Sequence, residues 1–543
     1  MSKVEKIKIA SNHLRGTLKE SLQNPITAAI SEDDQTVIKF HGIYQQDDRD
    51  RREERASKKL EKLYSFMIRL RIAGGKINAD QWLGIDAIAN HNSTGVIKIT
   101  TRQTVQLHGV IKSKLKPTVA SFAKFGLDSI AACGDVNRNV MAAVTIAKNF
   151  GYDEVYECSK KISDYLLPKT NAYHEIWLDQ EQISGKEEEP LYGEVYLPRK
   201  FKIGIAIPPN NDADIYSQDI GLVAIIENDI LQGFNILVGG GMGMTHGNEA
   251  TYPRLASLIG YLPKEKILDA TFHIAAIQRD YGNREDRKLS RFKYTIDKYG
   301  VDWFVLELEK RLSLKLEKAR DFEFKNRGDN YGWDQDYQGN YHNLIFVENG
   351  RVYDCEKTQL KSALLEIAKN NYGNFRFTNN QNIIIADVLP ENREAVENIL
   401  EKYNADSSRF SNLRLDALAC VALNTCPLAL AEGQRYLPAL IDKIEPLLTK
   451  HNLADEKISI RMTGCPNGCA RPYLAEIGLV GKSYGKYNLY LGASNNGDRL
   501  NKLYREDFGE KEILTELDQL FGLYFKNRKP NENFGDFTFR EIL

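Results

Sequence analysis

The chain contains one two-part pattern twice, and this internal repeat limits its fold more than any other feature. Ile97–Gln103 and Phe375–Gln381 both alternate apolar and polar residues, with Thr and Gln at matched positions. In a second pair, Ile203–Ile207 matches the segment that begins at Ile460. The segments occur in the order A, B, A′, B′, which duplication of a two-domain unit would give. The sequence therefore predicts a molecule built from two related halves.

The repeat and the length of 543 residues predict several domains, because chains of this size rarely form a single hydrophobic core. The B segments alternate β-branched strands with helical stretches, which indicates an α+β fold. We expect an N-terminal arm followed by two copies of a small unit and a larger domain. The expected ranges are 1–56 for the arm, then 57–126, 127–330, 331–400 and 401–543.

Charge and targeting signals exclude some classes of protein. The formal net charge is −1, so nothing global points to nucleic acid or an anionic membrane as a partner. The N-terminus has no apolar secretory segment, and the chain has no apolar run of about 18 residues, so we expect a cytoplasmic protein. The seven cysteines are an odd number, which argues against a disulfide framework.

Four cysteines gather in the last part of the chain, in a pattern typical of a metal site. They are Cys420, Cys426, Cys465 and Cys469. Four thiolates are the usual ligands of a [4Fe–4S] cluster, whereas zinc sites prefer closer pairs. Zinc and inert buried thiols remain the alternative interpretations.

The repeat helps to interpret these cysteines. In the first copy, Pro208 and Asp212 stand at the positions of Cys465 and Cys469. Because the fold does not need cysteine there, we expect the thiols of the second copy to serve chemistry. Cys426 precedes a proline, so we also expect a helix over 428–448 whose N-terminus stabilises this sulfur as an anion.

Several motifs resemble those of the siroheme-dependent sulfite and nitrite reductases. The most specific is RMTGCPNGCAR at Arg461–Arg471, with TCP at Thr425–Pro427 upstream. The resemblance covers nearly the whole chain. It extends to HGIYQQDDRD at His41–Asp50, YLPRKFK at Tyr196–Lys202 and GFNILVGGG at Gly233–Gly241.

The resemblance implies a pseudo-twofold α+β architecture, in which each ferredoxin-like half-domain is followed by a siroheme and iron–sulfur type α/β domain. It implies two cofactors, siroheme and a [4Fe–4S] cluster. The implied activity is the six-electron reduction of sulfite to sulfide in assimilatory sulfur metabolism, which serves cysteine biosynthesis. It also implies that Cys469 is shared by cluster and siroheme iron, and that the other cluster ligands are Cys420, Cys426 and Cys465.

By the same resemblance, four cations bind the substrate, namely Arg69, Arg138, Lys200 and Lys202. Three polar residues lie near the cofactor, namely Arg102, Gln106 and His108. Period-two alternation places Arg69 with Arg71, and Lys200 with Lys202, on one face of a strand. The competing interpretation is that the charged residues lie on solvated strand edges and that His108 is a structural histidine.

Two other functions remain open, a siroheme nitrite reductase and a non-catalytic iron–sulfur electron relay. A second cation at Lys202 favours sulfite, because sulfite is the more highly charged anion. Gly239–Met244 lacks the full dinucleotide-binding pattern, so we expect NADPH to bind elsewhere. Electrons would then arrive from a partner, either a flavoprotein reductase subunit with FAD and FMN or a ferredoxin.

Overall fold

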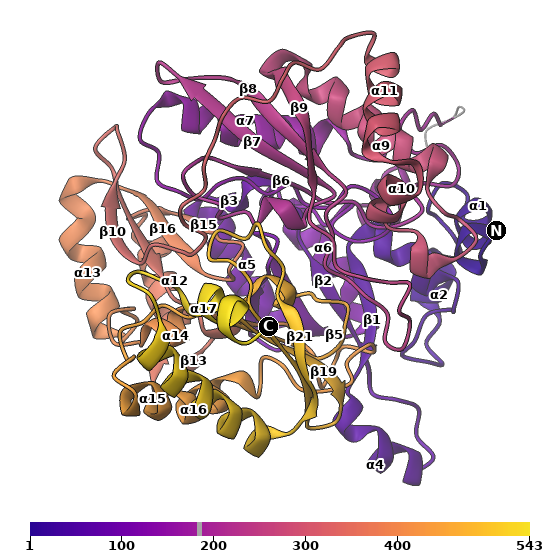
Figure 1. Ribbon diagram of the computed structural model, residues 1–543. Coiled ribbons are helices and arrows are strands. Elements are labelled where there is room, and N and C mark those ends of the chain that lie inside the picture. The colour runs from indigo at the N-terminus through magenta and orange to yellow at the C-terminus, as the bar shows by residue number, and fades with distance from the viewer. Residues whose placement is uncertain (182–186) are drawn as a thin grey trace.

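Two antiparallel sheets form the half-domains that the first repeat predicts (Figure 1). The computed structural model describes residues 1–181 and 187–543, so residues 182–186 of the expected domain 127–330 lie outside it. The first sheet has the strands β1 (Ile43–Asp47), β2 (Tyr64–Arg69), β5 (Val105–Val110), β4 (Ile97–Ile99) and β12 (Arg351–Val352), in that spatial order. The second has β10 (Gly332–Gln335), β11 (Tyr341–Ile345), β16 (Ile383–Val388), β15 (Asn374–Phe377) and β3 (Lys76–Ile77).

Each half-domain sheet is accompanied by two amphipathic helices. These are α5 (Ala79–Asn92) and α6 (Leu115–Ala123) in the first, and α12 (Leu360–Lys369) and α13 (Arg393–Lys402) in the second. Asn78 starts α5 through a capping box, in which its side chain accepts from Gln81 N at 2.8 Å while Gln81 Oε1 accepts from Asn78 N at 3.1 Å. Trp82, Ile85 and Ala89 then fall on one buried face of the helix.

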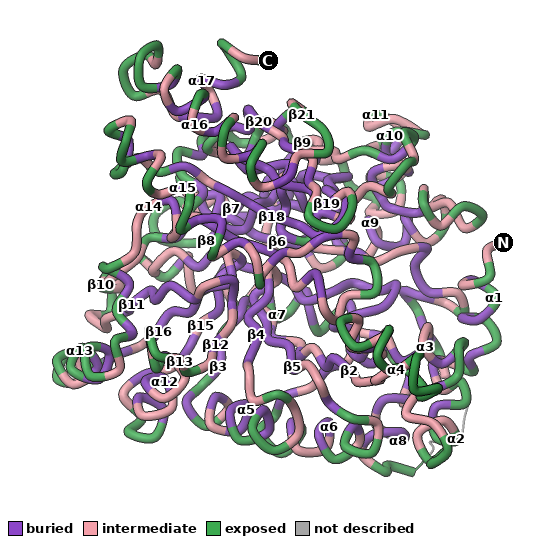
Figure 2. The backbone as a smooth tube through the Cα atoms, turned by 90° about the horizontal axis from the view of Figure 1, so that it is seen from below, coloured by how far each residue is buried: buried purple, intermediate pink, exposed green. Residues whose placement is uncertain are grey.

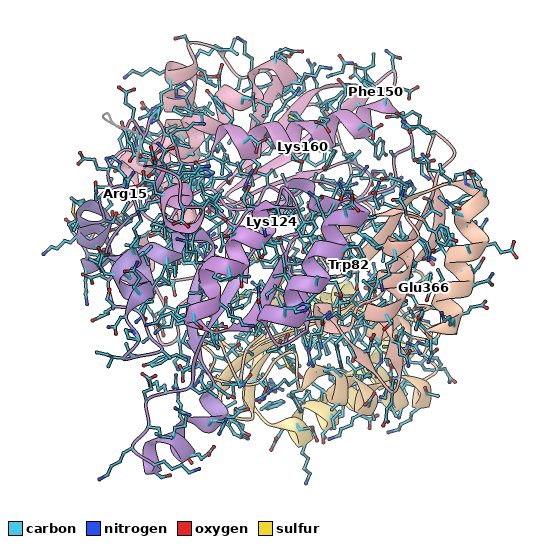
Figure 3. All side chains as sticks on the ribbon, turned by 180° about the vertical axis from the view of Figure 1, so that it is seen from behind. Arg15, Trp82, Lys124, Phe150, Lys160 and Glu366 are labelled. Carbon is cyan, nitrogen blue, oxygen red and sulfur yellow. The ribbon has the colours of Figure 1, made fainter. Side chains whose placement is uncertain are left out.

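The half-domains exchange one short strand each. β3 follows β2 in the sequence, but it pairs with β15 of the second sheet, with Ile77 opposite Phe375. In return, β12 pairs with β4 of the first sheet, with Val352 opposite Ile97. Trp82, labelled in Figure 3, packs across this junction with its ring centroid 5.0 Å from that of Phe375. The exchange makes the two half-domains parts of one pseudo-twofold structure.

The two larger domains share a strand pattern, a parallel pair followed by an antiparallel hairpin. The first contains β6 (Ile203–Ala206), β7 (Ile220–Glu227), β8 (Ile230–Val238) and β9 (Ser257–Pro263). The second contains β17 (Ala417–Ala419), β18 (Ile460–Thr463), β19 (Ile477–Ser483), β20 (Lys486–Leu491) and β21 (Lys502–Phe508). Ile203 lies opposite Ile220 and Ile460 lies opposite Ile477, so the matched segments have matched registers. This agreement confirms the predicted duplication.

The remaining helices surround these sheets. The first copy has α7 (Phe150–Tyr165), α8 (Ala172–Trp177), α9 (Ile267–Tyr281), α10 (Phe292–Tyr299) and α11 (Val301–Leu312). The second copy has α14 (Asn412–Leu415), α15 (Leu437–Lys450), α16 (Glu510–Asn527) and α17 (Phe534–Glu541). A small hairpin is formed by β13 (Asp354–Cys355) and β14 (Thr358–Gln359). Strands β6, β7 and β18 run through the buried centre of the molecule (Figure 2).

The N-terminal residues form α1 (Lys3–Ala10), α2 (Leu18–Gln23), α3 (Asp34–Val37) and α4 (Arg52–Ser57). Ile7, Leu14 and Leu18 join the main core, which continues through both half-domains and the first large domain. The second large domain has its own core, from Leu413 to Phe537. β1 lies inside the expected N-terminal range 1–56 and pairs with β2 along its whole length, so this part of the arm extends the first half-domain sheet. No described helix is both long and apolar enough to cross a membrane.

Candidate functional site

The cysteines lie on two loops at the same edge of the second large sheet. Cys420 follows β17, and Cys465 comes two residues after β18, which runs parallel to β17. Parallel neighbours end at the same edge of a sheet, so the loops meet there. Gly464 N lies 3.4 Å from Cys420 Sγ. Leu430 and Ala431 donate their backbone N–H groups to Gly464 O at 2.7 and 3.0 Å, which joins the two loops.

The helix expected to begin after Cys426 does not form there, so that prediction is wrong. α15 begins only at Leu437, with Pro438 in its first turn. The segment before it makes turns, and Gln434 N donates to Cys420 O at 2.9 Å. The backbone N–H and C=O groups of this segment form hydrogen bonds with the neighbouring loops, so they do not need the hydrogen bonds of a helix. Cys426 therefore lies in a loop.

The four cysteines lie near enough to act on one another's pKa. Burial raises the pKa of Cys420 above its ordinary value, and Cys469, Cys465 and Cys426 raise it further. Burial and then Cys469 raise the pKa of Cys426 to about 11. The pKa of Cys465 is raised by the same two causes. Without a bound cation such thiols hold their protons at neutral pH, and a metal centre would displace them.

The donor set of the four cysteines fits an iron–sulfur cluster better than one zinc ion. Four thiolates are the ligands that a [4Fe–4S] cluster needs. Five residues separate Cys420 from Cys426, and 38 residues separate that pair from Cys465 and Cys469, whereas structural zinc sites prefer closer pairs.

A glycine-rich loop of the first large domain packs against the turn between Cys465 and Cys469. Met244 N donates to Pro466 O at 2.8 Å. At Gly468, where φ is +62°, a Cβ atom would lie 3.2 Å from Met242 O. The segment 239–244, which lacks the dinucleotide pattern, thus belongs to the surroundings of the cysteines.

The two predicted lysines lie beside this turn. Phe201 between them is fully buried, while Lys200 and Lys202 are half-buried. Burial and then Arg199 lower the pKa of Lys200 to about 7, and the nearby Cys469 opposes this shift. Burial and then Lys200 lower the pKa of Lys202 well below its ordinary value. Both lysines and Cys469 therefore share one region.

Arg102 connects the lysines to the predicted arginines. Burial and then Arg138 lower the pKa of Arg102 to about 9, and Arg69 contributes in the same direction. Its Nη1 donates to Gln218 Oε1 at 2.8 Å. Its Nε is buried and has no hydrogen-bond partner among the described residues. We call Arg69, Arg102, Arg138, Lys200 and Lys202 the basic cluster.

The predicted residues Gln106 and His108 form a hydrogen-bonded chain that ends on Arg69. Gln106 satisfies both ends of its amide when its oxygen accepts from Arg69 Nε at 2.8 Å and its nitrogen donates to His108 Nε2 at 3.1 Å. His108 Nδ1 then donates to Gln46 Oε1 at 3.0 Å. Burial, and then the charges of Lys98 and Arg69, lower the pKa of His108 to about 3. His108 is therefore neutral and orients Gln106.

Arg71 does not join the basic cluster, although strand alternation placed it with Arg69. β2 ends at Arg69. Arg71 forms ion pairs with Asp128 and with Asp164, each at 2.7 Å. Arg69 instead donates to Cys133 Sγ at 3.0 Å. The end of the strand thus separates the two arginines.

Sequence reasoning missed two further cations at this site, Arg199 and Arg291. Both lower the pKa of Lys200, and Arg291 is paired with the buried Asp219 at 3.1 Å. Arg199 stands inside the YLPRKFK motif, which could have indicated it, whereas Arg291 lies in no recognised motif. Cations that lower one another's pKa repel, and a bound anion would offset this repulsion.

Comparison with known families identifies the family of the chain. A profile described as the nitrite and sulphite reductase 4Fe-4S domain matches residues 157–316, in the first large domain, which does not include the four cysteines of the site. The ferredoxin-like half-domain of nitrite and sulfite reductases matches residues 58–125 and 335–403. The chain belongs to the nitrite and sulfite reductase family.

Curated relatives match this family member over nearly its full length. A protein of Leptospira biflexa serovar Patoc is 58% identical, and the match covers 99% of this chain and 97% of the relative. A protein of Staphylococcus haemolyticus is 54% identical, and the match covers 99% of this chain and 94% of the relative. Both are named sulfite reductase [NADPH] hemoprotein beta-component. The structure of NirA from Mycobacterium tuberculosis has the same fold, with a TM-score of 0.80 over 98% of this chain and 95% of that chain, at 23% identity.

The residues present fit the cofactors of the family. Cys420, Cys426, Cys465 and Cys469 supply the four thiolates that a cluster needs. The basic cluster beside Cys469 suits the carboxylates of a siroheme and a small oxyanion. The buried Nε of Arg102, which has no partner among the described residues, is one donor that such an anion would satisfy.

Proposed function

We propose that the chain reduces sulfite to sulfide at a siroheme coupled to a [4Fe–4S] cluster, with both cofactors held by this chain. The balanced reaction takes SO₃²⁻, six electrons and seven protons to HS⁻ and three waters. The observation that carries the proposal is that four neighbouring thiols lie beside a largely buried group of cations, with Lys200 near both. A relay that only passes electrons has no use for that group.

Each part of the site has a proposed role. Cys420, Cys426, Cys465 and Cys469 would hold the cluster, and Cys469 would also serve the siroheme. Arg102 and Gln106 would contact the siroheme carboxylates, with Gln106 oriented by His108. When bound, the two cofactors supply electrons to the substrate one at a time.

The remaining cations bind and protonate the substrate. Arg69 and Arg138 donate hydrogen bonds to the sulfite oxygens, and these charge-assisted bonds are stronger than neutral ones. Lys200 and Lys202 add positive charge and donate protons as the S–O bonds break. The pKa of Lys200, lowered by burial and then by Arg199 to about 7, suits this task, because a proton donor works best with a pKa near the working pH.

Electrons reach the cluster from a separate protein, which we propose to be a flavoprotein subunit that oxidises NADPH. The names of the relatives support this, since a beta-component of an NADPH enzyme has another component. A ferredoxin is the alternative donor.

The test is an anaerobic assay of the purified holoprotein with reduced methyl viologen and either sulfite or nitrite. We expect turnover with both anions and a higher kcat/KM for sulfite. A kcat/KM for nitrite that clearly exceeds the value for sulfite would make the protein a nitrite reductase. Stoichiometric reduction of the cluster by viologen, with no turnover on either anion, would support the relay.

A further inference from the structure

A cavity of about 600 Å³ lies where the second half-domain meets the second large domain. One wall is formed by β12, the β13–β14 hairpin and the start of α12, and the other by residues 405–410, α14 and α15. These elements lie at the lower left of Figure 1. Ligand pockets usually measure about 300–1,000 Å³ and often lie between domains. None of the lining residues belongs to the basic cluster or to the four cysteines, so the proposed sulfite chemistry does not use this cavity.

Part of the cavity is apolar and aromatic. The rings of Phe346 and Phe410 lie with their centroids 5.0 Å apart and their planes at 60°. Tyr353 is a third aromatic residue of the lining, and Leu360 and Ala405 add aliphatic surface. Phe346, Leu360 and Ala405 are each buried. A surface of aromatic and aliphatic side chains suits a flat ring, which can stack on it.

Three cations stand beside these rings, and we call them the cavity cations. Arg351 Cζ lies 4.7 Å from the ring centroid of Tyr353, and Arg409 Cζ lies 4.7 Å from the ring centroid of Phe410. Stacking on a ring holds a guanidinium in place and leaves its N–H edge available to an anion. The third cation, Lys357, is exposed on the turn of the β13–β14 hairpin.

The carboxylates of the lining do not neutralise the cavity cations. Arg414 forms ion pairs with Glu348 at 2.9 Å and with Asp442, so these two carboxylates are already occupied. The third carboxylate, Glu356, is exposed to solvent. In the part of the chain that the structure describes, none of the cavity cations forms an ion pair. Their charge is therefore available to a ligand.

Arg409 shows that this charge is held in place rather than free to turn away. Its Nη1 donates to Lys357 O at 2.9 Å, which joins the loop 405–410 to the β13–β14 hairpin. Burial lowers the pKa of Arg409, and the nearby Asp406 and Cys355 offset only part of this shift. A bound anion would supply the missing countercharge.

We propose that the cavity binds a small aromatic phosphate of the size of a mononucleotide. The ring lies against Phe346 and Phe410, and the phosphate accepts hydrogen bonds from the cavity cations. Phosphate is favoured because a phosphate monoester carries nearly two negative charges near pH 7, and because the arginine fork matches a pair of phosphate oxygens. The inference is independent of the proposed function, since no residue is shared between the two sites.

The test is isothermal titration calorimetry of the purified holoprotein with three probes, AMP, adenosine and inorganic phosphate. We expect AMP to bind with a Kd of about 100 μM or less. Adenosine and inorganic phosphate should each bind about tenfold or more weakly, because each probe reaches only one part of the site.

A double variant and a matched control locate the site. Arg351→Gln with Arg409→Gln should weaken AMP binding by about tenfold or more, because hydrogen bonds to a charged phosphate are lost. The control is Lys298→Gln with Lys310→Gln, which removes two exposed cations from α10 and α11. Its Kd for AMP should stay within about twofold of the unaltered value.

A single variant serves if the double variant does not fold. The side chain of Lys357 is exposed, so Lys357→Gln should keep the fold and weaken AMP binding by about three- to tenfold. The proposal is overturned if AMP does not bind at 1 mM, or if its Kd is the same in the cavity variants and in the control. Adenosine or inorganic phosphate that binds as tightly as AMP would also overturn it, because the site would then not recognise ring and phosphate together.

Discussion

We expect the preference for sulfite over nitrite to depend on Lys202. Burial, and then the charges of the neighbouring Lys200 and Arg102, hold the pKa of Lys202 well below its ordinary value. A substantial fraction of sulfite near neutral pH is a dianion, whereas nitrite carries a single charge. A dianion therefore relieves more of the repulsion within the basic cluster and gains more from each cation.

Replacing this lysine should change the substrate preference. In Lys202→Asn, we expect the ratio of kcat/KM for sulfite to that for nitrite to fall roughly tenfold to hundredfold, because a hydrogen bond to a charged group contributes about 1.5–3 kcal/mol. The ratio is measured with methyl viologen at equal siroheme occupancy. Lys298→Asn, on the exposed surface, serves as the control. An unchanged ratio in Lys202→Asn would mean that Lys202 does not act on the substrate.

The cysteines give a second prediction at this scale. Cys420→Ser, Cys426→Ser and Cys465→Ser should each lose the cluster, because serine is a poor ligand for iron. Cys158→Ser and Cys355→Ser should keep it, since these thiols lie away from the two loops. Cluster content is measured by iron and acid-labile sulfide analysis. The unaltered protein should contain about five irons and four sulfides per chain. Full sulfide content in any of the first three variants would remove that residue from the ligand set.

The sequence named residues that the fold brings into one region, but not how their side chains are held. The four cysteines come from the repeat and from their spacing, whereas Lys200 and Lys202 lie just before β6, outside the strand that alternation assumed. Alternation failed at Arg71, because it assumes a strand that continues, and β2 ends at Arg69. Arg291 comes to the site through a buried pair with Asp219, and such a long-range contact leaves no local pattern.

At the scale of elements, the strand exchange depends on two matched glycines. Gly75 precedes β3 with φ +75°, and a Cβ there would lie 2.7 Å from Phe377 O. Gly350 precedes β12 with φ +69°, and a Cβ there would overlap Ile99 O. Gly75 and Gly350 occupy matching positions in the two copies of the repeat. Each half-domain therefore binds the strand that it receives from the other half-domain in the same way. Strands of two residues carry no periodicity, and the sequence therefore did not predict the exchange.

The close approach at Gly350 leads to a stability prediction. Gly350→Ala should lower Tm clearly more than Gly485→Ala. Gly485 also has a positive φ, +70°, but a Cβ there would meet nothing within 4 Å. Both variants carry a backbone strain of about 1–2 kcal/mol, and only Gly350→Ala adds a steric overlap with the partner half-domain. Equal Tm values by thermal unfolding would show that the contact at Ile99 does not matter.

At the scale of the whole molecule, Asp214 joins the two large domains. It belongs to the first copy and accepts from Arg461 at 2.9 Å and from Arg471 at 2.5 Å, both in the second copy. Burial alone would raise the pKa of Asp214, but Arg461, Arg471 and Arg327 hold it well below its usual range. Its contribution to stability is therefore fully present above about pH 4, the ordinary aspartate value, and decreases as the pH falls below that.

Removing this charge should weaken the molecule as a unit. Asp214→Asn leaves buried arginines without their carboxylate, and breaking a buried ion pair costs about 3–5 kcal/mol. We expect a large loss of Tm at pH 7 and a smaller loss near pH 3, since below about pH 4 the unfolded chain binds a proton at Asp214 and the stabilising effect of the native carboxylate is already reduced in the unaltered protein. Asp229→Asn, at the exposed turn before β8, serves as the control. A loss of Tm that is the same at both pH values would contradict this account of Asp214.

The number of electrons consumed for each sulfide released tests the central claim most directly. Purified holoprotein is given limiting sulfite and excess reduced methyl viologen under anaerobic conditions, and oxidised viologen and sulfide are measured together. We predict six one-electron equivalents for each sulfide, with no sulfide formed when sulfite is omitted. Protein with full siroheme and cluster content that forms no sulfide from sulfite would contradict the assignment of this chain as a sulfite reductase.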